Sequence, residues 1–166
     1  MRHHEPALRS KAALVIGRRV QNLNWMEKHL QQVDPRVRAN VIESLWRNDS
    51  PETTGIFRHY QRDPHNRVAG NALIGLYLRE PEEAVQSIRA MAEHTDPKFR
   101  VTAAWVIGMT VNARFLHVIR SMMRDPDGKV RGAACRALFR IKDGASPLHE
   151  QTVESPTPAW RLQALR

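Results

Sequence analysis

The dipeptide Asp-Pro recurs along the chain at nearly regular intervals, and no other sequence feature constrains the fold as strongly. It stands at Asp34-Pro35, Asp63-Pro64, Asp96-Pro97 and Asp125-Pro126, and the middle interval is slightly longer than the other two. Glu5-Pro6 extends the series upstream by one more interval. Self-similarity with a period of about 30 residues is typical of a solenoid, in which each unit is one supersecondary element stacked on its neighbours.

The segment after each dipeptide predicts a helix. Aspartate is a good N-cap, and proline suits the first helical position because the N–H it lacks would have no helical partner there. Apolar residues then recur at helical spacing around a mostly small pair. The five segments are aligned from Leu8, Val37, Asn66, Phe99 and Val130. In three of them the tenth place is a glycine, which suits a helix end: Gly17, Gly75 and Gly108. A second amphipathic stretch precedes each dipeptide, so each unit is expected to be an antiparallel helix pair.

The repeated pattern D-P-x-x-V-R, followed by A-A-x-A-L, resembles the HEAT repeat family, in particular the short bacterial units of the phycobilisome-lyase kind. The resemblance covers Glu5 to about Ile141. It implies an all-α fold, a right-handed α-α superhelix of the armadillo type with four to five helical pairs.

The predicted solenoid occupies residues 1–141, with the second helix of the first unit at 5–20. The further units are expected at about 22–48, 50–79, 81–111 and 112–141. Residues 142–166 form a tail with three prolines and no apolar period, which predicts an extended or disordered segment. Trp160 and Leu162 in this tail are candidates for capping the open end of the stack or for binding a partner.

Every unit has an arginine in second place of the aligned segment. The column consists of Arg9, Arg38, Arg67, Arg100 and Arg131. The resemblance implies that these arginines bridge successive turns together with Asp34, Asp63, Asp96 and Asp125. Unpaired charges at packed positions are costly, which favours this structural role over the alternative of an anion-binding row.

Composition favours an acidic partner and a reducing compartment. Lys and Arg number 26 against 17 Asp and Glu, a net charge of +9. Such an excess attracts nucleic acid, acidic protein surfaces or anionic membrane faces, although it also serves solubility. Cys135 is the single cysteine, which excludes an internal disulfide. No apolar run reaches the length of a signal peptide or a membrane span, so a cytoplasmic protein is expected.

No pattern predicts catalysis, a cofactor or a metal. The eight histidines do not align between units, whereas metal ligands must converge on one point. Cys135 occupies a small, packed place and is expected to be an inert core thiol. The glycines do not form a phosphate-binding loop. We therefore predict that the chain is not an enzyme.

A candidate binding groove lies on the second helices, which line the concave face of such solenoids. Trp105 occupies a groove-facing place, and a tryptophan among arginines has the composition of an interaction hot spot. The other predicted groove residues are Lys11, Arg18, Glu43, Arg47, Tyr77, Arg79, Arg136 and Arg140. The alternative is that Trp105 folds down over alanines and seals a shallow groove.

The leading hypothesis is a non-catalytic scaffold that binds an acidic protein or peptide along this groove. The alternative is nucleic-acid binding through the same groove, by resemblance to HEAT-like DNA glycosylases, although no catalytic residue can be identified. None of these patterns specifies an oligomeric state.

Overall fold

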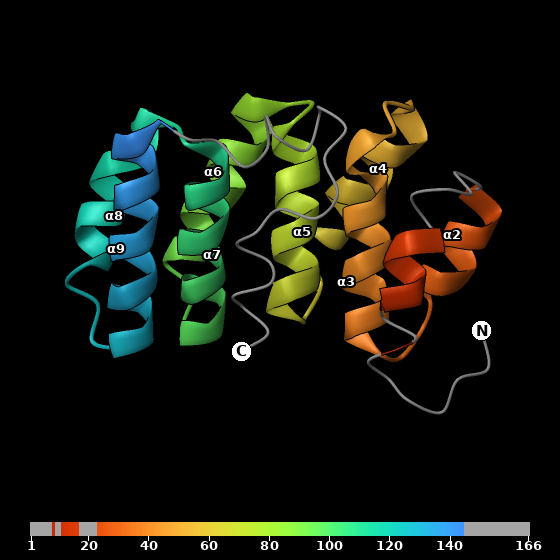
Figure 1. Cartoon of the computed structure of the whole chain (residues 1–166), viewed down its shortest axis with the longest axis horizontal. Coiled ribbons are helices and arrows are strands. Elements are labelled where there is room, and N and C mark those ends of the chain that lie inside the picture. Colours follow the sequence, from red (N-terminus) through yellow and green to blue (C-terminus); the bar gives the residue numbers. More distant parts are fainter. Residues whose placement is uncertain (1–7, 9–10, 17–22, 145–166) are drawn as a thin grey trace.

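The computed structural model describes residues 8, 11–16 and 23–144 as a row of helix pairs (Figure 1). Residues 11–16 are helical. The pairs are α2 (Leu23–Leu30) with α3 (Pro35–Ser44), α4 (Pro51–Tyr60) with α5 (Asn66–Tyr77), α6 (Pro81–Ala92) with α7 (Pro97–Thr110) and α8 (Leu116–Met122) with α9 (Gly128–Asp143). The short 3₁₀ helices η1 (Leu45–Arg47) and η2 (Ala113–Phe115) follow α3 and precede α8. The described residues contain no strand.

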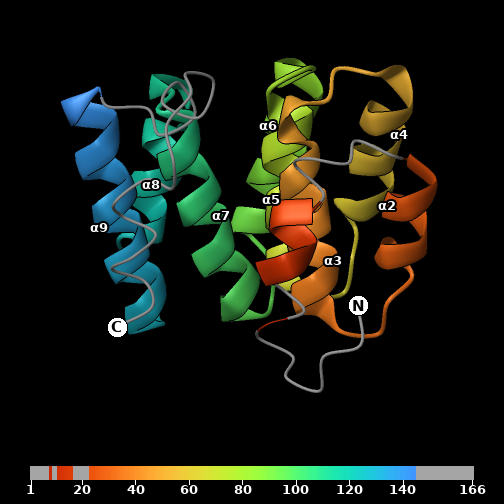
Figure 2. The same ribbon diagram turned by 45° about the vertical axis from the view of Figure 1, so that its right-hand side comes forward.

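The second helices of the pairs, α3, α5, α7 and α9, form one layer. Each packs against the next, and each also packs against the first helix of its own pair. Figure 2, turned by 45°, shows the same order of pairs along the row. The predicted all-α solenoid of stacked helix pairs is confirmed.

These second helices start at a uniform step along the sequence. Their N-cap residues are Asp34, His65, Asp96 and Asp127, which are equally spaced. The three aspartates each accept a hydrogen bond from the backbone N–H two residues further on, at 2.7 to 2.9 Å. Three residues after each cap stands Val37, Val68, Phe99 or Val130, and these side chains are buried or half-buried.

The prediction that every Asp-Pro aspartate caps a helix is wrong for Asp63 and Asp125. Each lies two residues before the cap, where its carboxylate accepts from the backbone N–H of the cap residue, at 2.8 and 2.9 Å. Asp34-Pro35 and Asp96-Pro97 therefore begin a helix, whereas Asp63-Pro64 and Asp125-Pro126 lie just before one. This difference explains why the dipeptides are unevenly spaced although the helix starts are evenly spaced.

Glycines allow close packing inside the helices rather than ending them. Gly75 and Gly108 lie within α5 and α7, which corrects their predicted place at helix ends. A Cβ on Gly108 would lie 3.2 Å from the Cα of Ala137 on α9. The predicted end at Gly17 lies outside the described residues.

Helix α9 extends past the predicted end of the solenoid at residue 141. It runs to Asp143 and is followed by Gly144 in the left-handed region, at φ 70°. The other unit boundaries stay predictions, and residues 145–166 lie outside the described residues. Of the helices that the structure describes, none is both long enough and apolar enough to cross a bilayer.

Candidate interaction surface

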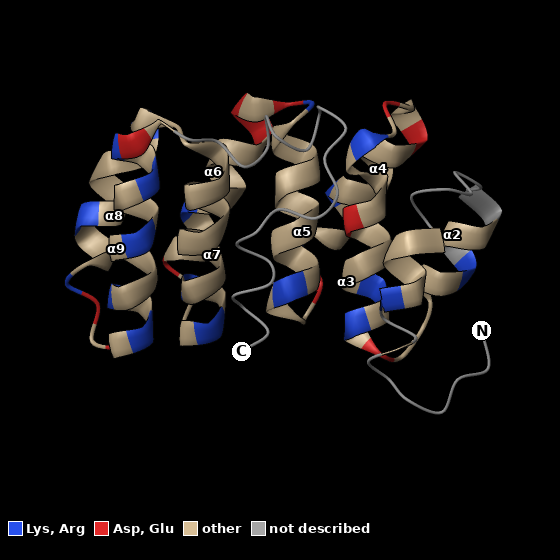
Figure 3. Cartoon of the chain, in the orientation of Figure 1, with Lys and Arg blue, Asp and Glu red and all other residues tan. Residues whose placement is uncertain are grey.

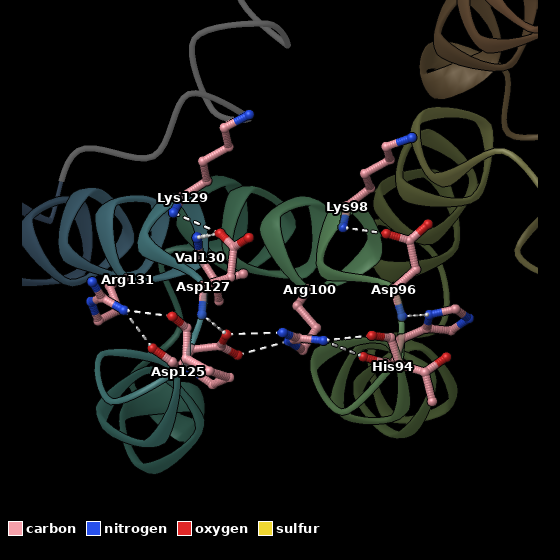
Figure 4. A network of polar contacts seen from close by, with 11 residues as sticks. His94, Asp96, Lys98, Arg100, Asp125, Asp127, Lys129, Val130 and Arg131 are labelled. Atoms are coloured by element: carbon pink, nitrogen blue, oxygen red, sulfur yellow. Dashed lines mark hydrogen bonds and ion pairs between the residues drawn. The ribbon is translucent and has the colours of Figure 1, made fainter.

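Three arginines hold the turns that precede the second helices. Arg38, Arg100 and Arg131, here called the clamp arginines, each lie four residues after an N-cap. From Nη1 each donates to two backbone carbonyls just before that cap, at 2.8 to 3.0 Å. Figure 4 shows two of these turns, around Arg100 and Arg131.

Two clamp arginines also reach the next unit. Nε and Nη2 of Arg100 donate to both carboxylate oxygens of Asp125 at 2.7 and 2.9 Å, and Arg38 binds Asp63 in the same way at 3.2 Å. The hydrogen bond from Arg100 is the main reason that the pKa of Asp125 lies below its usual value. The Asp125 and Asp63 side chains are only 9% and 6% exposed, so these carboxylates form their ion pairs inside the stack.

Arg67 does not belong to this set. It lies two residues after its cap, His65, and the place four residues after the cap is taken by the buried Ala69. The predicted column of five arginines therefore contains two kinds of residue. Arg9, its first member, lies outside the described residues.

Arg67 instead belongs to a row of exposed cations, one on each second helix. The cation row consists of Arg36, Arg67, Lys98 and Lys129, each two residues after an N-cap. Figure 4 shows Lys98 and Lys129 projecting in parallel, away from the arginine–aspartate contacts. Basic segments stand at the same end of α3, α5, α7 and α9 in Figure 3.

Neighbouring members of the row are close enough to affect each other. Desolvation lowers the pKa of Arg67, although the side chain remains exposed, and the positive charge of Arg36 lowers it further. Within the described part of the chain, no ion pair neutralises Arg67, Lys98 or Lys129. Arg67, Lys98 and Lys129 thus form a strip of positive charge that no ion pair among the described residues neutralises.

The comparison with known families agrees with this repeat geometry. A family model described as HEAT repeats matches residues 53–139 and again 85–166. The chain belongs to the HEAT repeat family. No curated protein matches it. HEAT repeats generally serve as protein-interaction scaffolds, whose stacked units offer extended surfaces to a partner.

Trp105 of this HEAT-repeat chain is half-buried and packs against the hydrophobic core. It contacts the neighbouring α5, since a Cβ on Gly70 would lie 3.7 Å from its Cζ3. Trp105 follows Lys98 by seven residues, two helical turns, and therefore lies on the same face of α7, about 10 Å away along the axis. Part of the ring lies over α5 while the rest reaches solvent.

Arg79 was expected in the groove but is used inside the fold. Its side chain is 10% exposed and donates to the backbone carbonyls of Gly75, Leu45, Trp46 and Asn48 and to Asp49. Its guanidinium also lies 4.9 Å from the ring centroid of Phe57. Arg79 is therefore not part of the predicted group of arginines around Trp105.

Glu43 and Tyr77 also differ from groove residues. Glu43 is 4% exposed, so the one acid predicted in the groove is inside the protein. Tyr77 is half-buried, and its hydroxyl accepts a hydrogen bond from Asn112 at 2.8 Å.

The remaining predicted cations are partly at the surface. Lys11, Arg47 and Arg136 are exposed, whereas Arg18 lies outside the described residues. Arg140 is half-buried beside Gly108 of α7; desolvation lowers its pKa, and the charge of Arg136 one turn away lowers it further. Whether these residues bind a partner stays a prediction.

The alignment of the third unit explains why the cation row was missed. The segments were aligned on their arginines, which shifts the third unit by two residues. Aligned on the buried column of Val37, Val68, Phe99 and Val130, the cations fall at an identical place in every unit. With this alignment, the residue of the third unit at the place of Trp105 is Ile74, which is buried.

The described residues contain no candidate metal site. No three His, Cys, Asp or Glu side chains come together there in a way that could hold a metal ion. Cys135 was expected to be packed in the core but is exposed on α9, because no further unit covers its position in the described structure.

Proposed function

We propose that this HEAT-repeat chain is a non-catalytic scaffold that binds an acidic segment of another protein along its second helices. The observation that carries the proposal is the cation row, four exposed basic residues at the same place of successive units. The carboxylates of Asp63 and Asp125 are already paired with clamp arginines. Among the described residues, no ion pair joins an acid to Arg67, Lys98 or Lys129.

The spacing of the row suggests the pattern of the partner. Packed helices lie about 8–10 Å apart, and a peptide in the polyproline II conformation rises about 3.1 Å per residue with three residues per turn, so every third side chain faces the same side. Such a peptide laid across the helices therefore presents one side chain to each cation at about every third residue. Trp105, on the same face as Lys98, offers an apolar contact beside the charges. The fitting partner is an extended segment with an acid at every third position.

Nucleic-acid binding is the second candidate, since the exposed cations of the row also attract phosphates. Binding of this kind weakens steeply with salt and shows little dependence on carboxylate spacing. Glycosylase activity is not proposed, because the acid predicted in the groove, Glu43, is buried.

Fluorescence anisotropy with two labelled peptides and one mixed-sequence DNA duplex tests the proposal. The first peptide has glutamate at every third position, and the second has the same composition with its glutamates adjacent. We expect the spaced peptide to bind more tightly. The triple variant R67A/K98A/K129A should weaken that binding by about threefold to a hundredfold, because exposed charge pairs contribute about 0.2–1 kcal/mol each.

The matched control is R62A/R120A/R124A, which removes the same charge from exposed arginines outside the row. Equal weakening by the control would mean that only net charge matters, which contradicts a specific row. Tight duplex binding with a steep salt slope and no preference between the peptides would instead select the nucleic-acid candidate.

A further inference from the structure

The outer side of α9 is an apolar surface that its counterparts in the other units do not expose. It is formed by Arg131, Cys135, Leu138 and Phe139, here called the α9 end face. Cys135 lies eight residues after its N-cap, and at that place Ile42, Leu73 and Ala104 are 0%, 1% and 0% exposed. Phe139 is 71% exposed, whereas Trp46 at the same place of the second unit is 8% exposed.

The earlier helices are covered at these places because the next unit packs on them. Trp46 donates from Nε1 to the backbone carbonyl of Asn71 on α5 at 2.8 Å, and Gly108 lies against Ala137 on α9. The α9 end face is thus built like a surface that receives another unit.

Arg131 shows the same incomplete contact. Arg38 and Arg100 use Nη1 for the turn before their own helix, and Nε and Nη2 for the next unit. Arg131 makes the two Nη1 bonds to its own turn, and among the described residues its Nε and Nη2 have no acceptor. These two donors are available to a further turn of chain.

The chain itself carries a matching sequence about one repeat length after Asp125. Residues 155–161, SPTPAWR, repeat the order of residues 125–131, DPDGKVR. Serine and threonine can serve as N-caps like aspartate, and proline suits the first helical position. Trp160 stands at the place of Val130, and Arg161 stands at the place of Arg131. The second match of the HEAT-repeat family model, over residues 85–166, also runs through this segment.

We infer that residues 155–166 are the segment that docks on the α9 end face and covers Cys135 and Phe139. By sequence, Trp160 and Arg161 are the equivalents of Val130 and Arg131 in this segment. This docking is independent of the partner proposed above.

Cys135 is the single cysteine of the chain, so the reactivity of its thiol measures whether the docked segment covers it. The rate of its reaction with Ellman's reagent is measured in the full chain and in W160A, W160F and R161A. We expect the thiol to react at least tenfold faster in W160A than in the unaltered chain. W160F should retain protection, because Phe99 occupies the equivalent place in α7. R161A should react faster than the unaltered chain.

The matched control is the double substitution C135S/S121C, which moves the only thiol to an exposed position on α8. Its reaction rate should not change when Trp160 is replaced. Rapid reaction of Cys135 in the unaltered chain, at a rate that W160A does not change, would overturn the inference. Protection that disappears on dilution would also overturn it, since the cover would then be a second copy of the chain.

Discussion

Gly75 lies where α5 is in close contact with α4, and replacing it with alanine should destabilise the protein. A Cβ at this position would lie 2.4 to 2.6 Å from three ring carbons of Phe57 on α4. The ring is fully buried, and the Arg79 guanidinium lies 4.9 Å from its centroid. The ring therefore has little room to move away.

The magnitude follows from two opposing effects. Overpacking of a dense core costs about 1–3 kcal/mol, whereas alanine is favoured over glycine in a helix by about 1 kcal/mol. Because a Cβ would overlap three buried ring carbons, the upper part of the overpacking range applies, about 2–3 kcal/mol, and the net expectation for Gly75→Ala is a loss of about 1–2 kcal/mol in the free energy of unfolding. For a domain of this size, that corresponds to a Tm lower by about 2–8 °C.

Gly55→Ala is the matched control. Gly55 lies inside α4, is exposed, and has no atom within 4 Å of the position that a Cβ would occupy. It should raise the Tm by about 2–4 °C, since only the helix preference of alanine, about 1 kcal/mol, acts there. Thermal and urea unfolding followed by circular dichroism measure both variants. If Gly75→Ala were as stable as the unaltered protein, the reasoning about close packing at Phe57 would be refuted.

Three further substitutions test other parts of the fold. Asp125→Asn should lower the free energy of unfolding at neutral pH by about 1–3 kcal/mol, the range for hydrogen bonds to charged groups. Because the pKa of Asp125 is lowered in the folded state, its stabilisation is present above the unfolded pKa and is lost as the pH falls through the lower folded pKa. The urea midpoints of the two proteins should therefore differ at pH 7 and approach each other in acid. Asn71→Ala should cost about 1–3 kcal/mol in urea unfolding, because it removes the donor to the buried carbonyl of Ala39. Val111→Gly should raise stability by about 0.5–1 kcal/mol in the same assay, since Val111 ends α7 at φ 48°, where a β-branched side chain is strained.

Much of the fold could be predicted from residues within single units. The capping aspartates Asp34 and Asp96, the prolines after them and the helical spacing of apolar residues are local signals. They depend on contacts a few residues apart, so reading them along the chain was enough to expect stacked helix pairs. The bridging of Arg38 to Asp63 and of Arg100 to Asp125 also agrees with what the HEAT resemblance implied.

The candidate surface was harder to predict, because it depends on where the third unit begins. Asp63 is a better N-cap by residue preference, yet α5 is capped by His65. An N-cap contributes about 1 kcal/mol, whereas burying a valine contributes about 1.5–3 kcal/mol. Starting α5 at His65 places Val68 in the buried column and leaves Asp63 free to receive Arg38. The same start moves Arg67 from the clamp position into the cation row.

Residues at equivalent places in different units also acquire different environments. Ile42 and Cys135 hold the same place after their N-caps, but the first is buried by α5 and the second is exposed at the end of the described stack. The sequence by itself determined the stacked helix pairs and the excess of positive charge. Only the tertiary structure decided which cations are paired within the stack and which stay on its surface, because pairing depends on distances between units that no single unit encodes.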